Sequence, residues 1–194
     1  PLIFAVLARE LYRDPKCSRL GFGLMAGAWL LFFPNAPYIF TDLIHLTSRF
    51  YRYFWVDLTL ILLCAFTGLI LGFVSLYLMQ SVVTRMFGRM ASWFFVAVVA
   101  GLSGCGIYLG RFLRFNSWDV IVNPAHVFHG LNSWASNPHP YMYPYSSHAT
   151  FAFPALFALF VFVSYVMLYA LTHLPKPELP RVDLDTKPPV PLPA

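Results

Sequence analysis

Four polar side chains that can carry out chemistry lie at helical spacing, shortly after an apolar stretch that prolines interrupt. Asp42, His45, Arg49 and Arg52 follow one another at intervals of three, four and three residues. Such spacing places all four on one stripe of a helix. In that position Asp42 and His45 could transfer protons. The same stripe is also typical of the polar face of a helix that lies in a membrane interface.

A second polar group follows a later apolar stretch. Arg111 and Arg114 are three residues apart and share a helix face. Arginines at a helix end can reach toward lipid head groups, or they can hold an anionic group by bidentate contacts, and both interpretations stay open. The spans inferred below bring these groups to one side of a membrane. They form a candidate outer-face polar cluster of Asn35, Asp42, His45, Asp57, Arg111, Arg114, Asn116 and Asp119.

Histidines suggest a metal only weakly. The pairs Asp42–His45 and His126–His129 have the i,i+3 spacing that could ligate a metal from one helix face. No HExxH-type pattern accompanies them, so we predict no metal. Aromatic residues near the ends of the spans are explained by interfacial belts. A pigment or quinone pocket could use the same residues, and the cofactor stays unknown.

The elements that must position these residues are membrane-spanning helices. Of 194 residues, 59% are hydrophobic and only 11% are charged, against about 25% charged in ordinary soluble domains. A span needs about 20 apolar residues, and four stretches without interior charges meet this length: Leu20–Phe40, Leu58–Met79, Ser92–Gly110 and Thr150–Thr172. The sequence predicts an all-α, polytopic transmembrane bundle with at least four spans and an outer-leaflet interfacial helix.

The basic residues predict the orientation. Nine of the 13 Lys and Arg residues fall on the side of the chain's C-terminal tail, and four fall on the other side. Because cytoplasmic loops carry the excess of Lys and Arg, we place the nine in the cytoplasm. The expected location is the bacterial inner membrane, with the lipid bilayer as partner, other membrane subunits as further candidates, and no nucleic acid.

The two ends of the chain differ from the predicted bundle, residues 1–174. Residues 1–8 are apolar but too short to span, and we interpret them as the remnant of a truncated upstream helix. Residues 175–194 contain seven prolines, so this tail is predicted to be disordered.

The first span contains Pro34-Asn35-Ala36-Pro37. The two prolines remove backbone donors and disfavour helix in the preceding residues. Broken backbone inside a membrane requires cover by protein or a wet cavity, and such breaks often build sites. The alternative is a helix that ends near the interface.

Three of the four spans carry glycines four residues apart. This spacing lets helix backbones approach closely. The pairs face helices of this chain or of a partner, and the pattern alone leaves both open. They are Gly23 and Gly27, Gly68 and Gly72, and Gly106 and Gly110.

Several ordered motifs resemble a bacterial family called domain of unknown function 1361. They are the runs 31–38 (LFFPNAPY), 41–46 (TDLIHL), 72–79 (GFVSLYLM) and 110–119 (GRFLRFNSWD), with Trp55 and Asp57. The resemblance covers roughly residues 20–125, while the segment from His126 to His148 departs from the family pattern. It implies a membrane fold, further hydrophobic segments upstream, and no known reaction.

Three functions fit the sequence. The first is a structural or accessory membrane subunit, whose polar cluster stabilises the bundle or a partner contact. The second is a membrane enzyme for lipid-linked or anionic substrates, in which Arg111 and Arg114 hold the anion and Asp42 and His45 transfer protons. The third is a small transporter, which the absence of ionisable residues in mid-span disfavours. Convergence of the polar groups around a cavity would favour the enzyme, and scatter would disfavour it.

Overall fold

A computed structural model describes residues 1–13, 18–48, 53–115, 119–136 and 148–174. Throughout these residues the chain is helical and no strand is formed, which confirms the all-α prediction. In chain order the elements are α1 Leu2–Arg13, α2 Arg19–Phe32, α3 Asn35–Tyr38, the 3-10 helix η1 Ile39–Ser48, α4 Phe54–Phe87, α5 Arg89–Arg111, α6 Asp119–Val122, α7 Pro124–Ser136 and α8 His148–Thr172. The predicted C-terminal tail, residues 175–194, lies outside the described residues.

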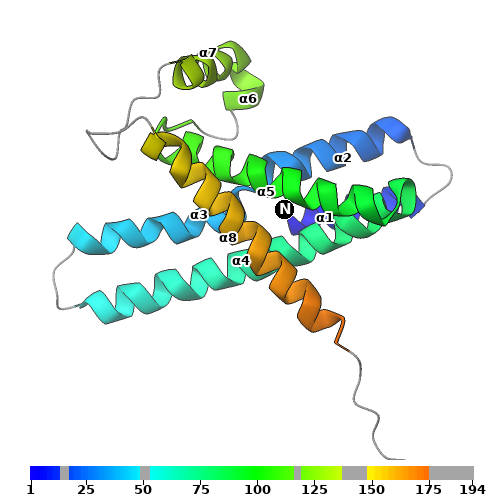
Figure 1. The fold of residues 1–194 in the computed structure, drawn as a ribbon, viewed down its shortest axis with the longest axis horizontal. Helices are drawn as coiled ribbons and strands as arrows, with labels where there is room; N and C mark the ends of the chain where they lie inside the picture. Colours follow the sequence, from blue (N-terminus) through cyan, green and yellow to red (C-terminus); the bar gives the residue numbers. More distant parts are fainter. Residues whose placement is uncertain (14–17, 49–52, 116–118, 137–147, 175–194) are drawn as a thin grey trace, which may run out of the picture.

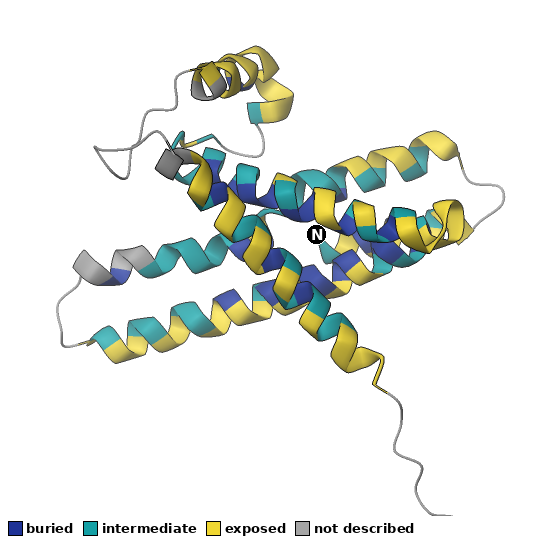
Figure 2. Cartoon of the chain, viewed as in Figure 1, coloured by how far each residue is buried: buried dark blue, intermediate teal, exposed yellow. Residues whose placement is uncertain are grey.

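Four helical stretches are long and apolar enough to cross a membrane: Arg19–Leu43, Phe54–Phe87, Arg89–Arg111 and Phe151–Thr172. Each overlaps one predicted span, so the prediction of a multi-pass membrane protein is confirmed. Figure 2 shows exposed residues along the outward sides of the long helices and buried residues where the helices meet. Many of the exposed side chains are large and apolar, such as Leu63, Phe94 and Leu156. Lipid rather than water is the solvent that suits this surface.

The α4 helix is longer than predicted. Its 34 residues extend about 51 Å at 1.5 Å per residue, whereas the hydrocarbon core of a bilayer is about 30 Å thick. The predicted span ended at Met79, and Gln80 is the next residue. In the structure Gln80 is buried and accepts a hydrogen bond from the Tyr165 hydroxyl of α8. This bond satisfies the Gln80 amide oxygen, and α4 continues past this residue to Phe87.

The core lies where α2, α4, α5 and α8 meet. Trp29 of α2 donates a hydrogen bond through Nε1 to Ser75 Oγ of α4 at 3.0 Å, and Ser75 Oγ donates to the Gly72 carbonyl at 2.7 Å. This short chain of bonds satisfies polar atoms that lipid could not. Around it pack buried apolar residues that include Phe33, Phe73, Leu76, Val96, Val99 and Val161.

The last long helix, α8, crosses α5 diagonally (Figure 1). The crossing is close at Gly104: a Cβ atom added there would lie 3.1 Å from Ala158 N and closer still to the Pro154 carbonyl oxygen. Glycine is therefore required for the two backbones to meet. At the other end of the chain, α1 packs against α2 and α4, with Ala5 and Ala8 fully buried.

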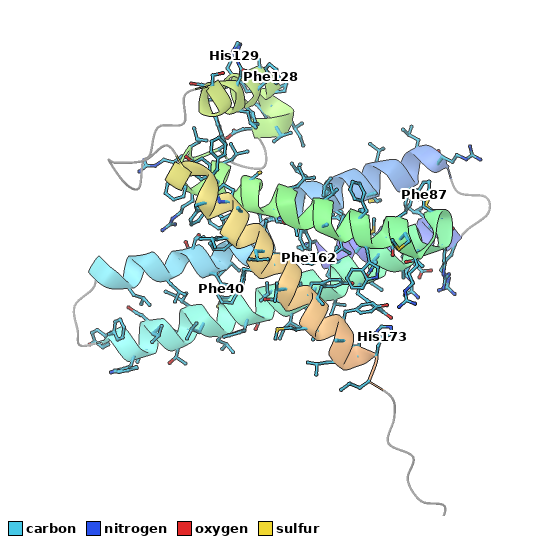
Figure 3. The ribbon with its side chains drawn as sticks, viewed as in Figure 1. Phe40, Phe87, Phe128, His129, Phe162 and His173 are labelled. Atoms are coloured by element: carbon cyan, nitrogen blue, oxygen red, sulfur yellow. The ribbon has the colours of Figure 1, made fainter. Side chains whose placement is uncertain are left out.

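The segment predicted as an interfacial helix begins as η1, which packs along the first half of α4. Phe40 joins it to two spans, because its ring meets Phe66 of α4 and Phe160 of α8 with centroids 5.5 Å apart in each case (Figure 3). The position of η1 along the outer leaflet stays a prediction.

Candidate functional site

The break in the first span is the irregular element around which the candidate site is built. The α2 helix ends at Phe32, and α3 begins at Asn35 after Pro34. Across the turn, Ala36 N donates to Phe33 O at 3.0 Å, a 3-10-type bond, and Tyr38 N then donates to Pro34 O at 3.1 Å, which resumes the α-helical pattern. The predicted interruption is therefore confirmed, and the span continues beyond it as α3 and η1.

One side of the break is covered by α4. A Cβ atom added at Gly72 would lie 2.8 Å from Ala36 Cβ, and one added at Gly68 would lie 3.1 Å from Ile39 Cδ1 and 3.3 Å from Ala36 O. Ala36 and Pro37 are buried. Because glycine has no side chain, the backbone of the break can lie directly against α4. The helix shields this irregular backbone from lipid, which could not satisfy its polar groups.

The other side of the break is covered by α5. A Cβ atom added at Gly106 would lie 3.2 Å from Pro34 Cβ and Cγ, and one added at Gly110 would lie 3.2 Å from Tyr38 Cε2. The break is consequently held between two glycine pairs, one on each neighbouring helix. By contrast, Cβ atoms added at Gly23 and Gly27 of α2 would meet no atom within 4 Å.

An ion pair lies about one helical turn beyond Tyr38. Arg111 Nη1, in the last turn of α5, lies 3.2 Å from Asp42 Oδ1 of η1. The Arg111 side chain is 18% exposed and the Asp42 side chain is 40% exposed. Beside the pair, Thr41 Oγ1 donates to the Tyr38 carbonyl at 2.7 Å. The pair therefore ties the far end of the broken span to α5.

Asp57 lies on a different helix from the two residues of this pair. It lies in the first turn of α4, 11 residues before Gly68, which faces Ile39. At 1.5 Å per residue, Asp57 is about 16 Å along the helix from the level of Ile39, whereas Asp42 follows Ile39 by only three residues. Asp57 and Asp42 are thus at different depths.

The remaining cluster residues are spread over several elements. Asn35 opens α3 and Asp119 opens α6. Arg114 follows α5, is exposed, and has a left-handed backbone with φ of 57°. The His45 side chain and Asn116 lie outside what the structure describes. Of the eight predicted residues, Asp42 and Arg111 form the ion pair between η1 and α5.

A pocket with a volume of about 620 Å³ opens beside the break. Its walls are mostly apolar, and Asn35, Tyr38 and Cys105 add polar atoms. The other lining residues come from α2, α5, α6, α7 and their connections: Gly27, Leu30, Leu31, Phe32, Pro34, Leu102, Gly106, Leu109, Gly110, Phe115, Val120, Val127 and Leu131. The pocket thus has one wall on the break and another on α6 and α7.

The sequence analysis missed α6 and α7. The α7 helix packs onto the end of α5 through Phe115, whose ring lies 2.6 Å from a Cβ atom added at Gly130 and 5.1 Å, between ring centroids, from His126. A signal was present, since Asn123-Pro124 matches an N-cap followed by proline at the first helical position. The Asn123 side chain accepts a hydrogen bond from His126 N at 3.4 Å.

The histidines of α7 do not gather with other ligands. His126 and His129 are both exposed, and Figure 3 shows His129 on the helix farthest from the long spans. Across the part of the chain that the structure describes, no three His, Cys, Asp or Glu side chains come together.

Residues 1–167 match the model of a family described as "Protein of unknown function (DUF1361)". The chain belongs to this family. The match includes the break, both glycine pairs that hold it, the Asp42–Arg111 pair and the helices that line the pocket. It also extends beyond residues 20–125 and includes the segment from His126 to His148, so our expectation that this segment departs from the DUF1361 pattern was wrong. No curated protein and no solved structure that was compared matches the chain.

Proposed function

We propose that this DUF1361 protein is an accessory subunit of the bacterial inner membrane, with its C-terminal tail in the cytoplasm. The proposal is based on one observation, the ion pair that two residues of the polar cluster form between helices. Asp42 and Arg111 form a tie between two helices, whereas Asp57 lies on a third helix, roughly 10 Å from Asp42 in depth along α4. A polar group that links helices stabilises a shape. It does not present a proton donor and an anion-binding group to one substrate.

The surface available to a partner lies on α2. Gly23 and Gly27 are exposed, and added Cβ atoms would meet nothing within 4 Å. Glycines at this spacing allow a second helix to approach closely in lipid. Gly27 also borders the pocket of about 620 Å³, into which larger side chains of the approaching helix can insert. We therefore expect the occupant to be a transmembrane helix of another subunit.

A membrane enzyme for a lipid-linked or anionic substrate is the second candidate, and the pocket beside the break favours it. Asn35 and Tyr38 line the pocket, and Gly110, which also lines it, directly precedes Arg111. In that function Arg111 would hold the anion. Its pairing with Asp42 already offsets much of its charge, which makes the structural function the better supported of the two.

Exchanging the two charges separates these functions. Asp42→Arg and Arg111→Asp should each lower the yield and thermal stability of purified protein, by about 1 kcal/mol or more, because like charges then face each other. The double exchange should restore most of the loss if the pair is a structural tie. Restored stability together with a lost cellular phenotype would instead support the enzyme.

The partner surface is tested with Gly27→Leu. No atom lies within 4 Å of an added Cβ, so the chain should fold normally, while the new side chain blocks a close helix. The measurement is the size of the complex extracted from native membranes in mild detergent, compared with the 22.1 kDa chain. Gly101→Leu on α5 is the matched control, because Gly101 is also open to 4 Å. An unchanged complex in the Gly27 variant contradicts the proposed surface.

A further inference from the structure

A second pocket lies at the opposite end of the bundle from the Asp42–Arg111 pair. Its volume is about 270 Å³. It is formed where α4 turns into α5 and where the last turns of α8 pass beside them. The lining residues are Tyr77, Gln80, Ser81, Thr84, Arg85, Arg89, Ser92, Trp93 and Tyr169.

The turn between the two helices brings two arginines to this pocket. Only Gly88, with φ of +88°, separates α4 from α5, and a left-handed residue there favours glycine. Gly88 N donates to Thr84 O at 2.9 Å, which closes the turn. Arg85 and Arg89 are thereby held on either side of it. Within the described ranges, neither arginine has an acidic group within 4 Å.

The other polar groups of this pocket leave few donors besides the two arginines. The hydroxyls of Ser81, Thr84 and Ser92 donate to backbone carbonyls at 2.6, 2.8 and 2.7 Å, so their protons are already used. Gln80 is 4% exposed, and its Oε1 accepts from the Tyr165 hydroxyl. Its amide nitrogen makes no hydrogen bond to any described residue. The groups left to donate are the Gln80 amide and the two guanidinium groups.

The surroundings suit a head group rather than a soluble ion. Tyr77, Trp93 and Tyr169 form aromatic walls, and the Trp93 and Tyr169 rings meet edge to face at 5.0 Å. Tyr169 stacks on His173 at 4.0 Å, and His173 marks the end of α8 in Figure 3. Tyrosine and tryptophan are enriched at the level of lipid head groups. Exposed Phe87 and Met90 beside the turn offer apolar surface to acyl chains.

We propose that this pocket, the Arg85–Arg89 pocket, binds the phosphate of an anionic phospholipid head group. Arginines bind phosphate with paired, charge-assisted hydrogen bonds, and basic pockets between transmembrane helices bind such head groups. The site is independent of the α2 surface and of the Asp42–Arg111 pair, so it stands whether or not the accessory-subunit function holds.

The test measures lipid binding to the full chain purified in a neutral detergent. Native mass spectrometry counts bound phosphatidylglycerol and, separately, phosphatidylcholine, for the wild type and for the double variant Arg85→Gln, Arg89→Gln. The double variant should weaken phosphatidylglycerol binding by about tenfold or more, since a hydrogen bond to a charged group is worth about one decade in affinity. Arg19→Gln is the matched control. Arg19 is exposed, opens α2 at the same end of the bundle, and is absent from the pocket lining.

Several outcomes decide the proposal. Phosphatidylglycerol binding that survives in the double variant overturns it, as does an equal loss in the Arg19 variant, because the attraction would then be a general effect of a basic rim. Binding of inorganic phosphate without any binding of phosphatidylglycerol overturns the lipid assignment. If the double variant fails to fold, the wild type still provides a test: raising the salt concentration must weaken phosphatidylglycerol binding and leave phosphatidylcholine binding unchanged.

Discussion

The crossing of α8 over α5 predicts opposite effects for two alanine substitutions on the same helix. At Gly104 an added Cβ would lie 3.1 Å from both Ala158 N and the Pro154 carbonyl carbon, and closer still to the Pro154 oxygen. All three atoms belong to the backbone, so no side chain can rotate away. At Gly101, one turn earlier, an added Cβ would meet nothing within 4 Å.

The expected magnitudes follow from these distances. Glycine in a helix interior costs about 0.5–1 kcal/mol relative to alanine, so Gly101→Ala should stabilise the protein by up to that amount. Gly104→Ala gains the same helix stabilisation. Its Cβ, however, forces α5 and α8 apart until the Cβ and the α8 backbone atoms are separated by the usual contact distance of about 3.5–4 Å. Overpacking of this kind costs about 1–3 kcal/mol. Separation also disturbs the edge-to-face contact of Phe112 and Phe153, whose ring centroids are 5.0 Å apart. Because the helix stabilisation is the same for both variants, they should differ by about 1–3 kcal/mol, the cost of the overpacking.

Reversible unfolding in mixed micelles, followed by tryptophan fluorescence, measures this difference. Gly101→Ala should unfold at the same or a higher denaturant fraction than the wild type, and Gly104→Ala at a clearly lower one. Equal stability of the two variants would refute the close crossing, because nothing else in the structure distinguishes the two positions so strongly.

Three further substitutions give distinct results. Ser103→Ala should raise the stability by about 1 kcal/mol in the same unfolding assay, because Ser103 Oγ is buried and, among the described atoms, has no hydrogen-bond partner. Trp29→Phe should lower it by about 1 kcal/mol, since the buried bond to Ser75 is lost; unchanged stability would contradict that bond. Gly130→Ala should leave the unfolding midpoint unchanged but speed hydrogen exchange in α7, because an added Cβ would lie 2.6 Å from the Phe115 ring.

The spans were predictable because their signal is local. A charged residue in mid-membrane is costly, so four uncharged stretches mark four helices regardless of how they pack. The ends of the helices were less predictable. Gln80 suggests an end to α4 only while its partner is unknown, and that partner, Tyr165, is 85 residues away. Where a polar residue finds a distant partner, local sequence underestimates the length of a helix.

The glycine pairs show the limit of a spacing rule. The pattern states that a close approach is permitted, and it marks all three pairs alike. The structure distinguishes them: the pairs at Gly68 and Gly106 lie against the break, and the pair at Gly23 lies open within the chain. Gly104, which makes the tightest contact, belongs to no predicted pair. Its neighbour four residues earlier is Ala100, so a search for any two small residues would have found it.

The sequence predicts the polar cluster as a set of residues on one side of the membrane, and this placement stays a prediction. Counting residues brought eight polar groups to one rim. Along α4, Asp57 lies about 16 Å from the level of Ile39. It is therefore at a different depth from Asp42. Asp42 and Arg111 are 69 residues apart, and they meet because α3, which leads into η1, packs against both α4 and α5.

The energies indicate which contacts fix the shape of the broken span. Asp42 is 40% exposed, so its pair with Arg111 is worth about 1 kcal/mol at most. A methyl group at Gly72, 2.8 Å from Ala36 Cβ, would cost about 1–3 kcal/mol by overpacking, and the glycines on α5 add further contacts of the same kind. The backbone of the break is therefore held in place by helix surfaces that lack side chains. The Asp42–Arg111 ion pair is a result of that packing. Its main effect is to hold η1, the segment after the break, against α5.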